Sequence, residues 1–219
     1  MLARVLGYYK KRGPLLLLLF LGILLPLIVL GVLSDEVLER EDIRLDRWVI
    51  GLMHPLASPT LQKIGLVLRF LGGVEVLGAA SLFIVGYLFL RKRFWKAVFF
   101  ALAMGGAVGL NLLAKAFFRR DRPLEALLHE PNYSFPSGHA SGSMAFAMAV
   151  IVLLWPSRWR WWAVMVGIGF TLLVGVSRIY LGAHYPSDVL GGWMASLAWV
   201  LGLRQVLRSR LRPSRPEPH

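Results

Sequence analysis

Long, uninterrupted apolar runs constrain the fold of this chain more than any other feature. Each of six runs is long enough to cross a bilayer, whose hydrocarbon core takes about 20 residues of helix. They cover residues 14–33, 71–90, 97–118, 139–155, 161–180 and 189–207, and Arg204 makes the last run the weakest. Because the runs do not alternate between polar and apolar residues, they favour helices over a barrel. The sequence therefore predicts an all-α membrane protein with a bundle of six transmembrane helices.

Composition supports a single integral membrane domain over residues 1–219. Of the 219 residues 57% are hydrophobic and 17% are charged, and the mean hydropathy is +0.61. These values exceed what the core of a soluble domain of this length requires. The first run is too long for a signal peptide and no small-residue cleavage site follows it, so we expect a retained anchor helix. The chain has no cysteine, which excludes disulfides and thiol chemistry.

Basic residues predict the orientation of the chain. Most of the Lys and Arg residues lie before the first run, after the second and fourth runs, and in the C-terminal tail. By the positive-inside rule both termini are cytoplasmic, and residues 208–219 form a basic cytoplasmic tail. We attribute the net charge of +13 to this topology and to contact with anionic lipids, and we expect no nucleic acid partner.

The first outer loop, residues 34–64, contains an amphipathic pattern. Its apolar residues recur at helical spacing at Leu45, Trp48, Val49, Leu52 and Met53. We expect an amphipathic helix on the outer surface between helices 1 and 2, with its acidic residues, Asp46 among them, on a solvated face that has no role beyond packing.

Polar and small residues within the runs suggest helix contacts. Asn111 is expected to bond a neighbouring helix, because an amide is costly in an apolar run. Gly191, Gly192 and Ala195 can pack against another helix of this chain or of a second copy, so the sequence leaves the oligomeric state open.

Three polar clusters lie on the outer side in this topology. The first is KAFFRRDRP, in which Lys115 and Arg122 are two helical turns apart and Pro123 ends the helix. Cations that snorkel to the membrane interface would explain Arg119 and Arg120. Lys115 fits that explanation less well, because it lies further inside the run.

The second cluster is PSGH, directly before the fourth run. Ser137 is a favoured N-cap residue, and Gly138 lets a ligand approach the backbone. The N–H groups at the start of a helix form an anion site beside His139. These residues alone are weak evidence for a function.

The third cluster, SRIYLGAHYPSD, lies between the fifth and sixth runs and contains Arg178, His184 and Asp188. Pro186 suits the first turn of a helix, so Asp188 would lie in that turn. A carboxylate there can accept a hydrogen bond from one nitrogen of His184 and leave the other able to attack an electrophile. An interfacial histidine beside a capping aspartate would explain this cluster equally well if it stood alone.

Together the three clusters resemble the signature of the type 2 phosphatidic acid phosphatase superfamily, in the family's order and over the core 115–188. The resemblance implies a metal-independent lipid phosphatase without cofactors. By that resemblance His184 is the nucleophile that forms a phosphohistidine, Asp188 orients it, and His139 protonates the leaving group and then helps to activate water. The same resemblance assigns phosphate binding to a further set of residues: Lys115, Arg122, Arg178, Ser137 and Gly138.

The resemblance also limits the substrate and the location. It offers phosphatidic acid, phosphatidylglycerol phosphate, lysophosphatidic acid or a polyprenyl diphosphate such as undecaprenyl diphosphate, and the sequence does not choose among them. The small size and short loops are similar to those of bacterial members, for which the site of a protein in the inner (plasma) membrane would face the periplasm or cell exterior.

Two other functions compete with this interpretation. A zinc hydrolase could use His139, His184 and Asp188 as ligands, but the nearby cations would repel a divalent metal and no HExxH pattern occurs. An anionic-lipid transporter or scramblase could bind head groups without hydrolysing them. Release of inorganic phosphate in the presence of a chelator distinguishes the metal-independent phosphatase from both.

Overall fold

The described part of the chain consists of helices joined by short segments. The computed structural model describes residues 13, 16–17, 19–39, 43–56, 58–123 and 131–211, and no strand occurs among them. The elements are η1 (Phe20–Leu24), α2 (Leu25–Leu38), α3 (Arg44–Met53), η2 (His54–Leu56), α4 (Pro59–Leu71), α5 (Val74–Leu90), α6 (Phe94–Phe118), α7 (Gly138–Leu154), α8 (Arg160–Tyr180) and α9 (Pro186–Val206). The predicted all-α class is confirmed.

Four helical segments of the described residues are long and apolar enough to cross a membrane. They are Phe20–Leu38, Pro59–Leu90, Phe94–Phe118 and Arg160–Tyr180. Helix α7 is apolar but shorter, and α9, which carries Asp188 and Arg204, is not among the four. The bundle of six spans therefore stays a prediction.

The second apolar segment begins earlier than the sequence predicted, because α4 precedes α5. Ser58 caps α4 by accepting a hydrogen bond from the N–H of Leu61 at 3.2 Å, and Pro59 occupies its first turn. The joint between α4 and α5 lies against α8: a Cβ on Gly72 would be 2.6 Å from Cγ1 of Val174. The outer loop is thus shorter than the expected range 34–64.

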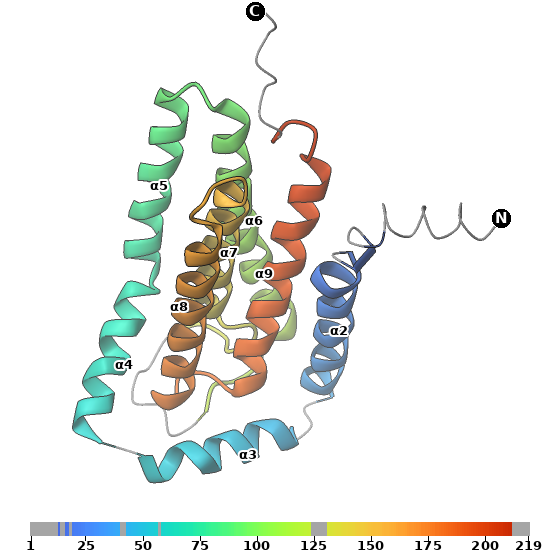
Figure 1. The fold of residues 1–219 in the computed structure, drawn as a ribbon. Coiled ribbons are helices and arrows are strands. Elements are labelled where there is room, and N and C mark those ends of the chain that lie inside the picture. Colours follow the sequence, from blue (N-terminus) through green and yellow to red (C-terminus); the bar gives the residue numbers. More distant parts are fainter. Residues whose placement is uncertain are drawn as a thin grey trace, which may run out of the picture.

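Helix α3 lies across one end of the bundle, where Figure 1 shows it running beneath the other helices. Its Trp48 and Leu52 are exposed, whereas Asp46 is buried and points toward α9. A solvated acidic face was therefore the wrong expectation for Asp46. The exposed apolar side chains suit a helix that rests on a lipid surface, and that placement remains a prediction.

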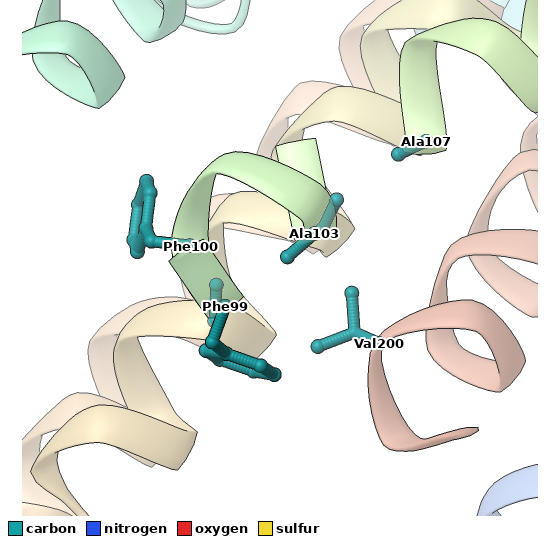
Figure 2. Packing of buried hydrophobic residues seen from close by; sticks show 7 residues of the cluster. Phe99, Phe100, Ala103, Ala107 and Val200 are labelled. Atoms are coloured by element: carbon teal, nitrogen blue, oxygen red, sulfur yellow. The ribbon is translucent and has the colours of Figure 1, made fainter. Parts of the chain in front are cut away.

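Small and aromatic side chains pack α6, α7 and α9 closely together. Figure 2 shows Phe99, Phe100, Ala103 and Ala107 of α6 beside Val200 of α9, all of them buried. Helix α7 also contacts α8 and α5, so it lies among four neighbouring helices of the described part of the chain. At its start, a Cβ on Gly192 of α9 would be 2.7 Å from the carbonyl oxygen of Ser137. This close approach fixes the beginning of α7 against α9.

Asn111 of α6 and two glycines of α9 make close contacts with the segment around the start of α7. Asn111 donates hydrogen bonds to the carbonyl of Pro136 at 3.0 Å and to Oγ of Ser141 in α7 at 3.2 Å, as predicted. Gly191 and Gly192 pack against Phe135 and Ser137 of the same chain.

Candidate active site

The three polar clusters meet at the end of the bundle that α3 covers. Helix α6 ends at Phe118, where Arg119 adopts a left-handed conformation (φ 48°) and turns the chain. Helix α7 begins after Ser137, whose hydroxyl accepts the N–H of Ala140 at 3.5 Å. Helix α8 ends at Tyr180 and α9 begins at Pro186. The site is therefore formed by the polar ends of these helices. Apolar packing further along the helices brings those ends together.

His184 and Asp188 form the centre of this site. Both are buried, with exposed fractions of 1% and 0%, and Nδ1 of His184 lies 3.5 Å from Oδ2 of Asp188. The aspartate occupies the first turn of α9, where its Oδ2 also accepts the N–H of Tyr185 at 2.8 Å and the hydroxyl of Ser134. The predicted geometry, a carboxylate beside one nitrogen of His184, is present.

The second nitrogen of His184 faces Arg122. Nη1 of Arg122 lies 3.3 Å from Nε2 of His184 and also donates to the carbonyl of Ala183 at 2.6 Å. A guanidinium can only donate, so Nε2 carries the lone pair and Nδ1 carries the proton that points toward Asp188. This tautomer is the one that a nucleophilic Nε2 requires.

Burial keeps His184 neutral. It lowers the pKa of His184 to about 4, an effect that the carboxylate of Asp188 opposes and that the positive charges of Arg122 and Arg178 reinforce. At neutral pH the imidazole therefore holds its lone pair in an enclosed, cationic setting.

The remaining predicted residues surround this pair. Lys115 is buried in the last turn of α6, and its ammonium donates to the carbonyl of Tyr133 and, at 3.5 Å, to Oδ1 of Asn132. Arg122 donates to the same asparagine oxygen, so Asn132 links the two cations. Arg178 is fully buried in the last turn of α8.

The start of α7 joins the site through the backbone. The N–H of Ser137 donates to the carbonyl of Asp188 at 2.9 Å, which ties the N-cap of α7 to the first turn of α9. Gly138 and His139 follow as the first two residues of α7 and are partly exposed. The structure thus gathers all eight predicted residues around one end of the bundle.

Several residues of the site were missed by the sequence analysis. Arg120 does not simply extend toward solvent: Nη1 donates to Oδ1 of Asp188 at 2.7 Å, and Nη2 donates to Oδ2 of Asp46 at 2.8 Å. Asp46 and Arg120 are 74 residues apart in sequence, and no local pattern pairs them. Ser134 and Asn132 lie outside every motif. Of the two arginines that snorkelling was expected to explain, Arg119 is exposed and Arg120 is partly buried.

The geometry offers little support for a zinc site. No group of three or more His, Cys, Asp or Glu side chains that could hold a metal ion occurs in the parts of the chain that the structure describes. Positive groups surround His184, and they would repel a divalent cation.

An apolar cavity of about 680 Å³ lies beside the site. Side chains of α2, α6 and α9 line it, and one end is formed by Asn111, Phe135, Pro136 and Ser141. Since Pro136 directly precedes Ser137, the cavity reaches the segment that carries the N-cap of α7. A hydrocarbon chain in this cavity would have its polar end near the cationic cluster.

Comparison with known proteins gives consistent matches. The family model of the PAP2 superfamily matches residues 96–212, more than half of the chain. Phosphatidylglycerophosphatase B of Bacillus subtilis is 28% identical over 148 residues, which cover 65% of this chain and 73% of that protein. The undecaprenyl-diphosphatase of Sulfolobus acidocaldarius is 41% identical over 101 residues, 43% of this chain and 46% of that protein.

Solved structures show the same fold. The crystal structure of a transmembrane PAP2 type phosphatidylglycerolphosphate phosphatase from Bacillus subtilis superposes with a TM-score of 0.76 at 22% identity, covering 86% of this chain and 96% of that one. The Aquifex aeolicus LpxE structure gives a TM-score of 0.63, also at 22% identity, covering 75% of this chain and 98% of that one.

These findings confirm the predicted family. The predicted enzyme class, a phosphoric ester hydrolase, agrees with the names of the matched relatives. The apolar helices and the fold agree with a membrane phosphatase. The chain is therefore an integral membrane protein that belongs to the PAP2 superfamily.

Proposed function

We propose that this protein is a metal-independent lipid phosphatase that works through a phosphohistidine. One observation carries the proposal: His184 is buried, its Nδ1 lies 3.5 Å from a carboxylate oxygen of Asp188, and its Nε2 lies 3.3 Å from the guanidinium of Arg122. Such an imidazole is a nucleophile held ready for an electrophile that bears negative charge.

The reaction proceeds in two displacements. Nε2 of His184 attacks the phosphorus, the bond to the lipid oxygen breaks, and His139 gives that oxygen a proton. Water, deprotonated by His139, then attacks the phosphohistidine and releases inorganic phosphate and neutral His184. Asp188 accepts the Nδ1–H throughout, which stabilises the positive charge of the phosphorylated ring.

The surrounding cations hold the phosphate. Phosphoryl transfer spreads negative charge over three equatorial oxygens, and catalysis depends on donors that are already fixed around them. Lys115, Arg122 and Arg178 supply positive charge, and Ser137 and Gly138 supply donors at the start of α7. Nη1 of Arg122 donates to the carbonyl of Ala183 and faces Nε2 of His184, and a phosphate oxygen can replace these two contacts.

The apolar cavity favours a substrate with a hydrocarbon tail. It lies between α2, α6 and α9 and ends beside the segment that precedes Ser137. Phosphatidic acid, phosphatidylglycerol phosphate and undecaprenyl diphosphate all combine such a tail with a terminal phosphate. The names of the matched relatives include the last two lipid classes.

The proposed orientation has both termini in the cytoplasm and the site at the periplasmic or outer face of an inner (plasma) membrane. The turn between α5 and α6, which holds Arg91, Lys92 and Arg93, lies at the opposite end of the bundle from α3 (Figure 1). Most of the basic tail, residues 212–219, falls outside the described residues. The positive-inside rule assigns this basic end to the cytoplasm.

The alternative is a transporter or scramblase that binds anionic head groups without hydrolysis. Binding alone does not need the His184–Asp188 pair, since cations suffice for it. The pair therefore favours the enzyme.

Phosphate release decides between the two. The detergent-purified protein is assayed with EDTA on phosphatidic acid, phosphatidylglycerol phosphate and undecaprenyl diphosphate, beside His184→Ala and the matched surface variant Arg119→Gln. We expect release by the wild type and by Arg119→Gln and none by His184→Ala. A folded wild-type protein that releases no phosphate from any of these lipids would refute the proposal, and EDTA-sensitive release would refute its metal-independent form.

A further inference from the structure

Arg120 links the site to the helix that lies across the end of the bundle. Its guanidinium donates to Oδ1 of Asp188 and to Oγ of Ser187 through Nη1, each at 2.7 Å, and to Oδ2 of Asp46 through Nη2 at 2.8 Å. The guanidinium carbon also lies 4.1 Å from the ring centroid of Tyr185. One cation is thus held between two buried carboxylates and an aromatic face.

Asp46 of α3 binds the first turn of α9 as well as Arg120. Its Oδ1 accepts the N–H of Ser187 at 2.8 Å, and its Oδ2 accepts the hydroxyl of Ser187 at 2.6 Å. The exposed fraction of the Asp46 side chain is 5% and that of Arg120 is 15%. Both oxygens of the Asp46 carboxylate therefore bind Ser187, the residue before Asp188, and one of them also binds Arg120, which is hydrogen-bonded to Asp188.

We propose that Arg120 and Asp46 are positioning residues for the proposed phosphoryl transfer. Arg120 fixes the Oδ1 side of Asp188, so that Oδ2 stays directed at Nδ1 of His184, and Asp46 fixes Arg120. The inference rests on the proposed function, because it assigns these residues to the same reaction. It extends the machinery to α3, which none of the three motifs includes.

The arrangement also sets the local balance of charge. The charged and hydrogen-bonding groups that face His184 are Asp188 of α9, Arg122 after α6, Arg178 of α8 and the hydroxyl of Ser134 before α7. Arg120 neutralises Asp188 from the side away from the ring. Without Arg120 the buried carboxylate would attract the proton of an imidazolium more strongly, and the nucleophile would become protonated at a higher pH.

The test compares kcat, KM and the pH dependence of kcat/KM for four site variants and two controls. The site variants are Arg120→Gln, Arg120→Lys, Asp46→Asn and the double variant Asp46→Asn/Arg120→Gln. The controls are Arg119→Gln, the exposed neighbour of Arg120, and Asp35→Asn, an exposed acid of α2. The substrate is the lipid phosphate that the wild type hydrolyses fastest, so its own ionisation affects every profile equally.

We expect Arg120→Gln to lower kcat by about 10² with KM changed by less than about twofold, because a misplaced catalytic group loses rate more than affinity. The acidic limb of the pH profile of kcat/KM for Arg120→Gln should move to higher pH by about one unit. Asp46→Asn should lower kcat by about tenfold without moving that limb, since Arg120 still neutralises Asp188. The double variant should be no slower than Arg120→Gln alone, because both changes break one network.

Arg120→Lys keeps the charge but not the planar fork that bridges two carboxylates, so its kcat should fall between those of the wild type and Arg120→Gln. If Arg120→Gln does not fold, the test rests on Arg120→Lys and Asp46→Asn, for which we expect a lower kcat and the KM of the wild type. A purely structural role would lower the fraction of sites that bind vanadate and leave kcat per intact site at the wild-type value in all four site variants, and that result would overturn the inference.

The failures of the two proposals can be told apart. An active wild type with Arg120 and Asp46 variants that match the controls would overturn this inference and leave the proposed function intact. A wild type that hydrolyses none of the lipids would overturn both.

Discussion

Replacing Asp188 by asparagine tests the central geometry most directly. The carboxylate has four polar neighbours: Nη1 of Arg120 at 2.7 Å from Oδ1, and the N–H of Tyr185, the hydroxyl of Ser134 and Nδ1 of His184 around Oδ2. An amide of the same shape has one oxygen and one NH2 group. In either orientation its NH2 therefore meets a donor, either that of Arg120 or that of Tyr185.

Both orientations impair the proposed nucleophile. With NH2 on the side of His184, the ring takes the tautomer with a proton on Nε2, which cannot attack. With NH2 on the side of Arg120, the tautomer survives but the phosphorylated ring loses its counter-charge. A carboxylate-to-amide change that leaves a catalytic histidine in the wrong tautomer lowers kcat by about 10⁴.

We expect Asp188→Asn to lower kcat by about 10³ to 10⁴, which corresponds to about 4.1–5.4 kcal/mol in the activation free energy. The assay measures kcat and KM from initial rates of phosphate release, with Asp35→Asn as the matched control. Vanadate binding measures the fraction of intact sites, so that loss of folded protein is not counted as loss of catalysis. A kcat within tenfold of the wild type at full vanadate binding would contradict this geometry.

Three further changes test other parts of the site. His139→Ala should lower kcat by about 10² to 10⁴, and a substrate with a good leaving group should restore the first step, which a pre-steady-state burst of the released leaving group would reveal; an unchanged kcat would exclude His139 as the acid. The pKa of His184 is about 4 in the folded chain and 6.5 in the unfolded chain. Between these values the unfolded chain binds a proton that the folded chain does not, so the free energy of unfolding of the wild type should fall by about 3 kcal/mol as pH falls from 6.5 to 4. His184→Asn should lack that loss in thermal unfolding at each pH, and parallel curves would contradict the shift. An impermeant maleimide should label Asp121→Cys on intact cells but Lys92→Cys only after permeabilisation, and the reverse pattern would invert the topology.

The sequence predicted the parts of the site that depend on local chemistry. Pro186 at the start of a helix placed Asp188 in its first turn, and the four-residue spacing then brought that carboxylate to His184. Ser137 as an N-cap follows from the same kind of local rule. The helical class followed from the apolar runs.

The parts that the sequence did not reveal depend on contacts between distant segments. Asp46 looked like one of several solvated acids, because a helical pattern identifies an apolar face but not what the opposite face meets. Arg120 looked the same as Arg119, although the left-handed turn at Arg119 directs the two side chains to different surroundings. The early start of α4 was missed because its polar Gln62 and Lys63 interrupt the apolar run that continues into α5.

The separation of the reacting groups from the apolar cavity explains why the motifs indicate a reaction class but no particular lipid. His184, Asp188 and the cations lie at helix ends, where short local patterns fix them. The cavity is lined instead by the sides of α2, α6 and α9, at positions such as Leu27, Ala114 and Gly202 that carry no chemical signature. A larger side chain at Ala114 or Gly202 would shorten the space for a hydrocarbon tail and leave the imidazole in its place. Selection among lipid tails can therefore change through these helix faces while the phosphoryl chemistry at the helix ends stays the same.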